Sequence, residues 1–249
     1  MSRIGVFDSG LGGYSIAYAI FKQYPLQDIV FLADQINVPY GNKEENELED
    51  ILYSRMSWFN RQGISDVILA CNTSSVLKLE RVNKDFPNLR LHRIIDLTVD
   101  QIKGQNLHEV IVLATKVTVE SHAYQKRINV ISPKTKVFEI ALVDLAKLIE
   151  DLVDDHQLDL ELDRHLSGFK HRKLPFIMGC THYPLIEAKL NDYLKGKGYS
   201  SIRPILDRND LFSVGSGNFV CYTTGNSDRL KRQIAVLFKH KQAILHIDI

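Results

Sequence analysis

Two stretches of this 249-residue sequence share one pattern: Ile68-Leu69-Ala70-Cys71-Asn72-Thr73-Ser74-Ser75 and Ile177-Met178-Gly179-Cys180-Thr181-His182-Tyr183-Pro184. In each stretch an apolar run ends in a cysteine, and small polar residues follow before a helical pattern begins. One stretch lies in the N-terminal half of the chain and the other in the C-terminal half. We interpret them as equivalent strand–cysteine–helix units that place two thiols on opposite sides of one cleft.

The rest of the chain repeats this alternation of buried strands and helices. The apolar runs that predict strands cover residues 3–7, 28–34, 66–70, 91–95, 109–114, 136–142, 175–179 and 201–206. Helical patterns cover residues 44–62, 97–105, 145–152 and 228–238, a segment after the glycine turn at residues 10–13, and part of the charged segment 154–173. Strands that alternate with helices predict parallel β-sheet, so the predicted fold class is α/β.

Polar or reactive residues directly follow most of the predicted strands. They are Asp8, Asp34, Cys71, Thr115, Cys180 and Asp207. Ligands of open α/β sheets bind outside the carboxyl ends of the strands, so we expect a site there. The similar units predict two similar lobes, each a mostly parallel sheet flanked by helices, with the active site in the cleft between them. We place the first lobe at residues 1–95 plus 207–249 and the second at residues 96–206.

Composition excludes several kinds of protein. The formal net charge of +1 gives no large field of one sign, so neither nucleic acid nor an anionic membrane is an expected partner. No apolar run approaches the length that a bilayer requires. An acidic residue, Asp8, comes too early for a signal peptide. Three cysteines do not suggest a disulfide framework and fit the reducing cytoplasm.

The position of Cys71 and Cys180 between a strand and a helix favours the thiolate form. Backbone N–H groups and the helix dipole at such a junction lower a thiol pKa from about 8.5 toward neutrality. A single buried cysteine is more often a small core residue, but two in matching contexts favour function. Cys221, between Val220 and Tyr222, has no such setting, and we interpret it as structural.

Five segments in order along the chain carry a family resemblance. They are Gly5-Val6-Phe7-Asp8-Ser9-Gly10-Leu11-Gly12-Gly13, Val38-Pro39-Tyr40-Gly41-Asn42-Lys43, Ala70-Cys71-Asn72-Thr73, Gly179-Cys180-Thr181-His182-Tyr183-Pro184-Leu185 and Tyr222-Thr223-Thr224-Gly225. The sequence resembles glutamate racemases, the cofactor-independent members of the aspartate/glutamate racemase family. The glycines of the first segment do not complete a dinucleotide-binding G-x-G-x-x-G motif, because Ser15 stands at its last position.

The resemblance implies a reaction with two bases. One thiolate removes the α-proton of a free amino acid while the opposite thiol protonates the other face, and neither a cofactor nor a metal is implied. By analogy with the family, Cys71 acts on the D-enantiomer and Cys180 on the L-enantiomer. The product, D-glutamate, would serve peptidoglycan synthesis and cell shape. The segment that contains Asp151, Asp154, Asp155 and His156 offers no specific set of metal ligands.

The resemblance also assigns roles to the neighbours of the two thiols. Asp8 and His182 would orient the thiols and assist proton transfer. Tyr40 and Gly41 would close one wall of the site. The predicted hydrogen-bond donors to the substrate carboxylates are Ser9, Asn72, Thr73, Thr115, Thr118 and Thr181. Without the resemblance, His182 would be read as a solvent-facing residue at a helix start, and Asn72 and Thr73 as helix N-caps.

Four positions depart from the family pattern. Val117 replaces a glycine and restricts the loop between two threonines, while Asp144 takes the place of a glutamate expected near the second thiol. Gln35 and Arg208 follow Asp34 and Asp207 where other residues are usual. These departures leave open whether glutamate is the preferred substrate.

Three hypotheses follow. The first is glutamate racemisation, with a broader aspartate/glutamate racemase as its nearest variant. The second is a cysteine hydrolase or transferase that uses Cys180 and His182 as nucleophile and base, in which Cys71 has no role. The third is a catalytically weak member that binds an amino acid or a protein partner. The expected partner is a small amino-acid substrate, and the resemblance adds a possible homodimer.

Overall fold

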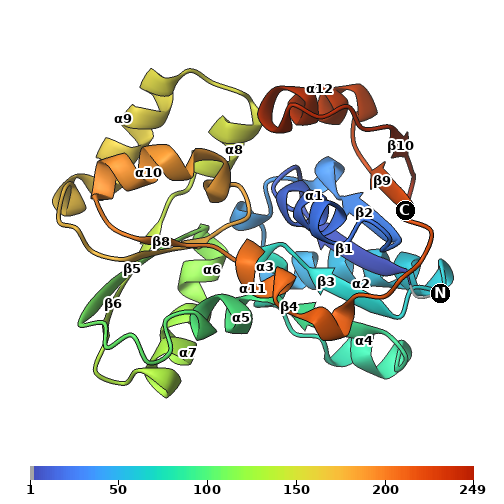
Figure 1. Cartoon of the computed structure of the whole chain (residues 1–249), viewed down its shortest axis with the longest axis horizontal. Helices are drawn as coiled ribbons and strands as arrows, with labels where there is room; N and C mark the ends of the chain where they lie inside the picture. The colour runs from blue at the N-terminus through green and yellow to red at the C-terminus, as the bar shows by residue number, and fades with distance from the viewer. Residues whose placement is uncertain (1–2) are drawn as a thin grey trace.

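The computed structural model of the chain describes residues 3–249; residues 1 and 2, with which the predicted first lobe begins, lie outside this range. The chain forms two parallel β-sheets, each flanked by helices (Figure 1). The six-stranded sheet has the order β10-β9-β2-β1-β3-β4, and the four-stranded sheet has the order β6-β5-β7-β8. The predicted fold class, α/β with two lobes built on parallel sheets, is confirmed. We call the lobes that contain the two sheets the first and the second lobe.

The six-stranded sheet brings the ends of two predicted strands together. Its strands are β1 (Ile4–Asp8), β2 (Ile29–Ala33), β3 (Asp66–Leu69), β4 (Arg90–Arg93), β9 (Phe219–Thr223) and β10 (Ile244–His246). β1 lies between β2 and β3, and Phe7 is in register with Leu69. Asp8 and Cys71 therefore emerge at the same edge of the sheet.

The four-stranded sheet likewise brings the ends of two predicted strands together in the second lobe. Its strands are β5 (Glu109–Ala114), β6 (Lys136–Ala141), β7 (Phe176–Gly179) and β8 (Gly198–Tyr199). Ala114 of β5 is in register with Gly179 of β7. The next residues along each strand, Thr115 and Cys180, therefore lie at neighbouring carboxyl ends.

Twelve α-helices and five short 3₁₀ helices connect the described strands. The α-helices are α1 (Tyr14–Gln23), α2 (Glu45–Arg61), α3 (Asn72–Ser75), α4 (Glu80–Asp85), α5 (Ile94–Asp100), α6 (Lys116–Glu120), α7 (Ala123–Ile131), α8 (Leu145–Glu150), α9 (Asp155–Leu166), α10 (Glu187–Leu194), α11 (Ile202–Leu206) and α12 (Ser227–Phe238). The 3₁₀ helices are η1 (Gln35–Asn37), η2 (Tyr40–Asn42), η3 (Ser167–Phe169), η4 (Tyr183–Ile186) and η5 (Asn209–Leu211).

Each sheet has a hydrophobic core on both faces, because successive side chains of a strand point to opposite sides. Val6 of β1 packs on one face in a cluster with residues of α1, and Phe7 packs on the other face with residues of α2. In the second lobe, Leu113 and Val112 of β5 divide in the same way between two clusters. Burial on both faces explains why the strands read as continuous apolar runs rather than as alternating patterns.

Two predicted strands differ from the structure. Residues 201–206 form helix α11, and Asp207 follows that helix rather than a strand. The available signal was Pro204, which is tolerated in the first turn of a helix but lacks the N–H that a central strand requires. The predicted strand at residues 91–95 is β4, which ends at Arg93, and α5 begins at Ile94. The strands β8, β9 and β10 were not predicted.

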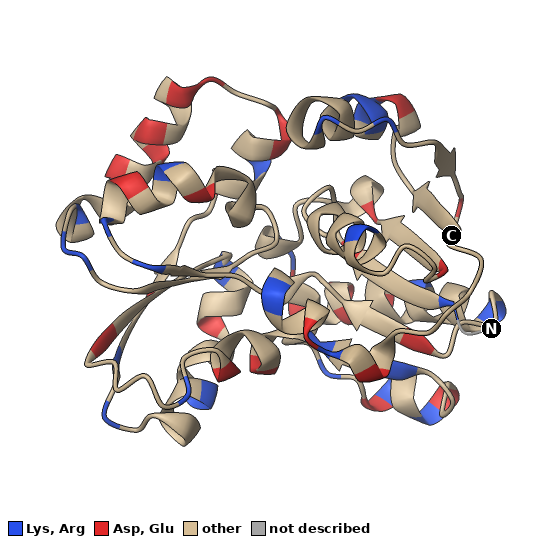
Figure 2. Ribbon diagram, in the orientation of Figure 1, with Lys and Arg blue, Asp and Glu red and all other residues tan. Residues whose placement is uncertain are grey.

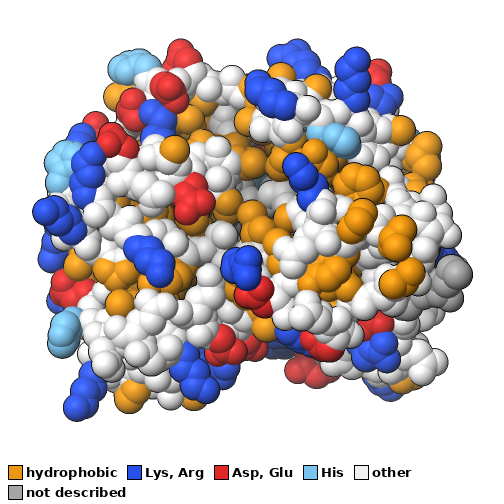
Figure 3. All heavy atoms as spheres, in the orientation of Figure 1, with side chains coloured by type: hydrophobic (Ala, Val, Ile, Leu, Met, Phe, Trp, Pro, Cys, Tyr) orange, Lys and Arg blue, Asp and Glu red, His pale blue; other side chains and the backbone are white. Residues whose placement is uncertain are grey.

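Charged side chains lie mainly on the outer helices and loops, whereas the strands carry few (Figure 2). The face drawn in Figure 3 mixes both signs of charge, with hydrophobic side chains gathered on the half that carries α1. Within residues 3–249, no helix is long and apolar enough to cross a membrane.

Candidate active site

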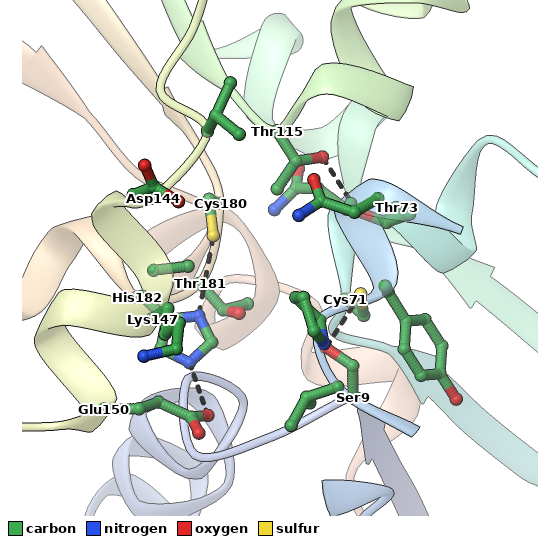
Figure 4. Close-up of a pocket in the computed structure, with 18 of the residues that line it drawn as sticks. Ser9, Cys71, Thr73, Thr115, Asp144, Lys147, Glu150, Cys180, Thr181 and His182 are labelled. Carbon is green, nitrogen blue, oxygen red and sulfur yellow. Dashed lines mark hydrogen bonds and ion pairs between the residues drawn. The ribbon is translucent and has the colours of Figure 1, made fainter.

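A cavity of about 310 Å³ opens at the carboxyl ends of both sheets, and residues of both lobes line it. The predicted site residues that line it are Ser9, Tyr40, Gly41, Cys71, Asn72, Thr73, Thr115, Cys180, Thr181 and His182. Two predicted residues, Asp8 and Thr118, are fully buried and are not among the described residues that line the cavity. Figure 4 shows the two sulfur atoms approaching the cavity from the two lobes.

Cys71 occupies the junction between β3 and α3, where it precedes the first helical residue in an extended conformation. Its side chain is 5% exposed, and its thiol donates a hydrogen bond to Ser9 Oγ over 3.6 Å (Figure 4). Burial, together with the nearby negative charge of Asp8, raises the pKa of the Cys71 thiol. The surroundings of Cys71 therefore favour the protonated form. The prediction that the strand–helix junction favours the thiolate is wrong for Cys71, because burial and the charge of Asp8 outweigh the N–H groups at the start of α3.

Asp8 lies beneath the cavity and joins the two lobes. Its Oδ1 accepts a hydrogen bond of 2.8 Å from the Gly10 N–H, and its Oδ2 accepts one of 2.9 Å from the Thr181 hydroxyl. Burial raises the pKa of the Asp8 carboxyl, although the nearby His182 opposes this shift. Asp8 is thus placed to hold Thr181, the residue after Cys180, against the first lobe.

Cys180 follows β7 and lies in a chain of hydrogen bonds with His182 and Glu150 (Figure 4). Its Sγ is 3.5 Å from His182 Nδ1, and His182 Nε2 is 2.9 Å from Glu150 Oε1. Burial alone would lower the pKa of His182, but the hydrogen bonds to Cys180 and Glu150 outweigh it and raise that pKa well above its usual value. For the Glu150 carboxyl the directions are reversed: burial alone would raise its pKa, but the hydrogen bond to His182 outweighs burial and lowers that pKa.

Glu150 lines the cavity and bonds to His182, but sequence reasoning missed it. The glutamate position near the second thiol had been assigned to Asp144, and this assignment is wrong. Asp144 lines the cavity, but its side chain is 54% exposed and lies 3.7 Å from Arg164. Glu150 is buried at the end of α8 and also accepts a 2.8 Å hydrogen bond from the Leu11 N–H. The signal available in the sequence was the position of Glu150 next to Ile149, an apolar residue on the buried face of α8.

The glycine turn after β1 lets the first lobe approach the second closely. A Cβ atom added at Gly12 would lie 2.8 Å from His182 Nδ1 and closer still to Thr181 Oγ1. A side chain at this position would therefore displace the segment that carries Cys180. This contact gives the turn its structural role.

Hydroxyl groups and one amide line the upper part of the cavity. Thr73 Oγ1 lies 2.9 Å from Thr115 Oγ1 (Figure 4). Thr115 Oγ1 in turn lies 3.0 Å from Thr118 Oγ1. Asn72 is 2% exposed, and its Nδ2 has no hydrogen-bond partner among residues 3–249. Neither Asn72 nor Thr73 caps the helix it begins, because the side chains bond elsewhere. A buried amide donor without a partner, beside a cavity, is suited to bind an anion.

The wall formed by Tyr40 and Gly41 rests on a buried ionic group. The Tyr40 hydroxyl donates to Asp34 Oδ2 over 2.5 Å, and Asp34 forms a 2.8 Å ion pair with Arg55. Asp34 also accepts a hydrogen bond of 2.8 Å from the Thr224 hydroxyl. Asp34 therefore does more than cap a strand, since it links η2 with α2 and the segment after β9.

The departures from the family pattern lie outside the hydrogen bonds of the two thiols. Val117 packs in α6 against the core of the first lobe, and Thr118 remains within hydrogen-bond distance of Thr115. Gln35 accepts a hydrogen bond from Thr223, and Arg208 pairs with Asp210.

Charged residues that the sequence did not single out stand at the cavity. Lys147 Nζ lies 2.6 Å from Asp151 Oδ2, and Arg229 Nη2 lies 2.9 Å from Asp151 Oδ1. Arg229 belongs to α12, so this group of three charges connects the two lobes. Lys147 and Arg229 give the cavity two cations that could meet an anionic ligand.

Comparison with known proteins shows the family. No family model matches the chain. A glutamate racemase of Fusobacterium nucleatum is 33% identical over 83% of this chain and 79% of its own length. The crystal structure of glutamate racemase from Francisella tularensis in complex with D-glutamate superposes with a TM-score of 0.88 at 26% identity, covering 100% of this chain and 97% of that one. For glutamate racemase from Aquifex pyrophilus the TM-score is 0.82 at 27% identity, with 98% of each chain covered. The chain belongs to the glutamate racemase family.

Proposed function

We propose that this protein interconverts L- and D-glutamate without a cofactor, with one of Cys180 and Cys71 removing the α-proton and the other delivering a proton to the opposite face. One observation carries the mechanism: a thiol from each lobe lines the same cavity. Racemisation needs a base on one side of the α-carbon and an acid on the other. The name shared by the relatives, and the D-glutamate bound in the similar structure, support glutamate as the substrate.

The surroundings of the two sulfur atoms differ, and this difference supports opposite roles for them at the start of a turnover with L-glutamate. Cys71 has a raised pKa and its thiol donates a hydrogen bond to Ser9, so it begins as the acid. Cys180 lies beside His182, whose raised pKa keeps the imidazole protonated, and a charged donor at sulfur activates a cysteine as a base.

The proton transfer can be written with every bond accounted for. The sulfur of Cys180 takes the α-proton of L-glutamate, and the electron pair of the broken C–H bond remains on the α-carbon as a carbanion. The S–H bond of Cys71 then breaks, and its proton joins the opposite face of that carbon to give D-glutamate. Cys71 is left as the thiolate and Cys180 as the thiol, which is the state that converts D-glutamate back.

Hydrogen-bond donors in the upper part of the cavity and cations at its mouth bind the two carboxylates of the substrate. The unpartnered Asn72 Nδ2 and the hydroxyls of Thr73 and Thr115 are candidate donors to one carboxylate. Lys147 and Arg229 are candidates for attraction of the second. A dicarboxylic amino acid fits this distribution better than a neutral one.

Exchange in deuterated water tests the proposal. The enzyme is incubated with L- or D-glutamate, with no cofactor added, and α-deuterium incorporation and optical rotation are followed. We expect loss of optical rotation together with incorporation of deuterium. Absence of exchange with both enantiomers would refute the assignment of glutamate, and exchange with aspartate alone would move the assignment to the broader variant.

A hydrolase or transferase reading has one observation in its favour. Cys180, His182 and Glu150 are connected in the order that a nucleophile, its base and an orienting carboxylate would take. Cys71 has no part in that chemistry, although it lines the same cavity. Activity that survives intact in Cys71→Ala would support the hydrolase and contradict racemisation.

Three further assignments belong to this proposal. We place the protein in the cytoplasm, where D-glutamate is needed as a precursor of peptidoglycan, and the free thiols Cys71, Cys180 and Cys221 suit a reducing compartment. We keep the lobes at residues 1–95 plus 207–249 and 96–206. The partly buried aromatic side chains Tyr18 and Phe21 of α1, beside Phe219, support a homodimer, and light scattering tests it.

A further inference from the structure

Tyr124 is a buried residue of the second lobe that connects with both cysteine segments although it does not line the cavity. It belongs to α7 and has no exposed surface. Its ring packs in the cluster that contains Ala114 of β5 and Ile177 of β7, the strands that precede Thr115 and Cys180. Burial raises the pKa of its hydroxyl, so the group remains a hydrogen-bond donor at physiological pH.

The hydroxyl of Tyr124 crosses from the second lobe to the first. It donates a 2.6 Å hydrogen bond to Oδ1 of Asn72, the residue directly after Cys71. With Oδ1 occupied, the amide can offer only its Nδ2, and this is the buried donor that has no partner among the described residues. If the amide rotated by half a turn, it would present an oxygen to the cavity and would repel a carboxylate.

The ring of Tyr124 supports the other cysteine. A Cβ atom added at Gly179, directly before Cys180, would lie 2.9 Å from Tyr124 Cε2. The end of β7 therefore rests against the edge of this ring. One side chain thus contacts the residue before Cys180 and bonds to the residue after Cys71.

We propose that Tyr124 is a positioning residue of the racemase, whose hydroxyl fixes the Asn72 amide so that Nδ2 faces the substrate carboxylate. This inference rests on the proposed function. The hydroxyl of Tyr124 acts on substrate binding through Asn72, whereas its ring supports the segment that contains Cys180. A second-lobe residue would thereby set the carboxylate site of the first lobe.

The test is the variant Tyr124→Phe, which keeps the ring and removes the hydroxyl. We expect KM for glutamate to rise about tenfold, the effect of losing one buried hydrogen bond, while kcat changes less than twofold, since a carboxylate contact is made in ground state and transition state alike. In an Asn72→Ala background, the same substitution should leave KM unchanged within a factor of about two, because the group on which the hydroxyl acts is missing.

Tyr199→Phe is the matched control. Tyr199 packs in the same cluster and donates its hydroxyl to Gln105, away from the cavity. Its substitution should lower the melting temperature about as much as Tyr124→Phe does, without raising KM. An unchanged KM for glutamate in Tyr124→Phe would overturn the inference. An equal rise of KM when Tyr124→Phe is added to Asn72→Ala would do the same. So would a Tyr124→Phe variant that is too unstable to assay while Tyr199→Phe remains folded. Failure of the parent enzyme to racemise glutamate would instead overturn the proposed function.

Discussion

The Cys71 and Cys180 sides of the cavity differ in charge. Among the described lining residues, those from Ser9 to Thr73 carry no charged side chain. The side around Cys180 includes Glu150 and His182 in contact with each other, and Lys147 and Asp151 at the mouth. Arg229, the charged lining residue from the first lobe, turns to Asp151 of the second.

This difference has a chemical purpose in a reaction with two identical side chains. Two cysteines in identical surroundings would have the same affinity for a proton, and nothing would decide which of the two is protonated when the other is not. Here burial and Asp8 hold the proton on Cys71, whereas Cys180 lies beside a charged imidazole. The asymmetry of the surroundings thus prepares one acid and one base from the same residue type.

The largest expected effect comes from removing either thiol. Cys71→Ala and Cys180→Ala should each reduce racemisation by at least about 10³-fold, as expected for loss of a positioned acid or base. The two variants should nevertheless differ in the exchange that remains. Cys71→Ala retains the Cys180 side and should exchange the α-proton of L-glutamate with deuterium without inverting it, and Cys180→Ala should do the same with D-glutamate.

Proton NMR in deuterated water measures this exchange directly. Exchange is the informative quantity, because the enantiomers have equal free energy in water and kcat/KM must therefore be equal in both directions for any variant. Racemisation at the parental rate in Cys71→Ala would defeat the scheme with two bases. If Cys71→Ala exchanged only D-glutamate and Cys180→Ala only L-glutamate, the enantiomers assigned to the two cysteines would have to be exchanged.

The second effect tests the charge of Glu150. Glu150→Gln keeps an acceptor for the Leu11 N–H but removes the charge that helps to raise the pKa of His182. A histidine with a raised pKa is protonated below that value and loses its proton as the pH rises through it. The alkaline limb of the kcat/KM profile should therefore move to lower pH, with a loss of about tenfold at pH 8.

Asp144→Asn is the control for this substitution, because Asp144 lines the same cavity without contacting His182. It should change kcat/KM by less than about threefold and leave the pH profile in place, as expected for an exposed carboxylate. A shifted profile in Asp144→Asn, together with a parental profile in Glu150→Gln, would return the role of the carboxylate to Asp144.

The Glu150 result marks the limit of what the sequence could predict. The positions of both cysteines and Asp8 directly after strands could be predicted, because strand ends are local patterns, whereas His182 was singled out only through the family resemblance. Glu150 could not, because its partner is His182 on a different element and only the fold brings them together. The same reason hid Tyr124, which acts across the lobes on Asn72.

The fold shows the same division between local and long-range information. Buried parallel strands such as β5 and β7 read clearly, because burial on both faces produces unbroken apolar runs. The short segment 201–206 was predicted as a strand, although Ile205 packs in the first-lobe core from a helix. β10 is an edge strand of three residues, too short to produce a periodic pattern.

A third prediction compares the two thiols by their reactivity. Cys71 and Cys180 are similarly buried, at 5% and 6% exposed, so reagent access should not separate them. Because the raised pKa of Cys71 keeps it in the thiol form, its alkylation by iodoacetamide in Cys180→Ala should be slow at pH 7 and should rise about tenfold per pH unit. Cys180 in Cys71→Ala should react about tenfold faster than Cys71 at pH 7.

Mass spectrometry of the labelled peptides gives both rates and separates them from any label on Cys221, which is fully buried. Adding His182→Gln to Cys71→Ala provides the control, since it removes the charged donor and should slow labelling of Cys180. Equal rates for Cys71 and Cys180 at pH 7 would contradict the division into acid and base.

The smallest effect concerns the charged mouth of the Cys180 side. The side chains of Lys147 and Arg229 are 65% and 51% exposed, so solvent screens their ion pairs with Asp151 and these pairs contribute little to stability. Their remaining effect is long-range attraction of an anionic substrate. Lys147→Gln should therefore lower kcat/KM about twofold to threefold at low salt, and the difference should vanish near 0.5 M salt. Lys78→Gln is the matched control, because the Lys78 side chain is also 65% exposed and paired with a carboxylate, that of Glu45, but is not among the described residues that line the cavity. A loss in Lys147→Gln that persists unchanged at high salt would instead mean that Lys147 contacts the bound substrate, and the mouth would then belong to the binding site.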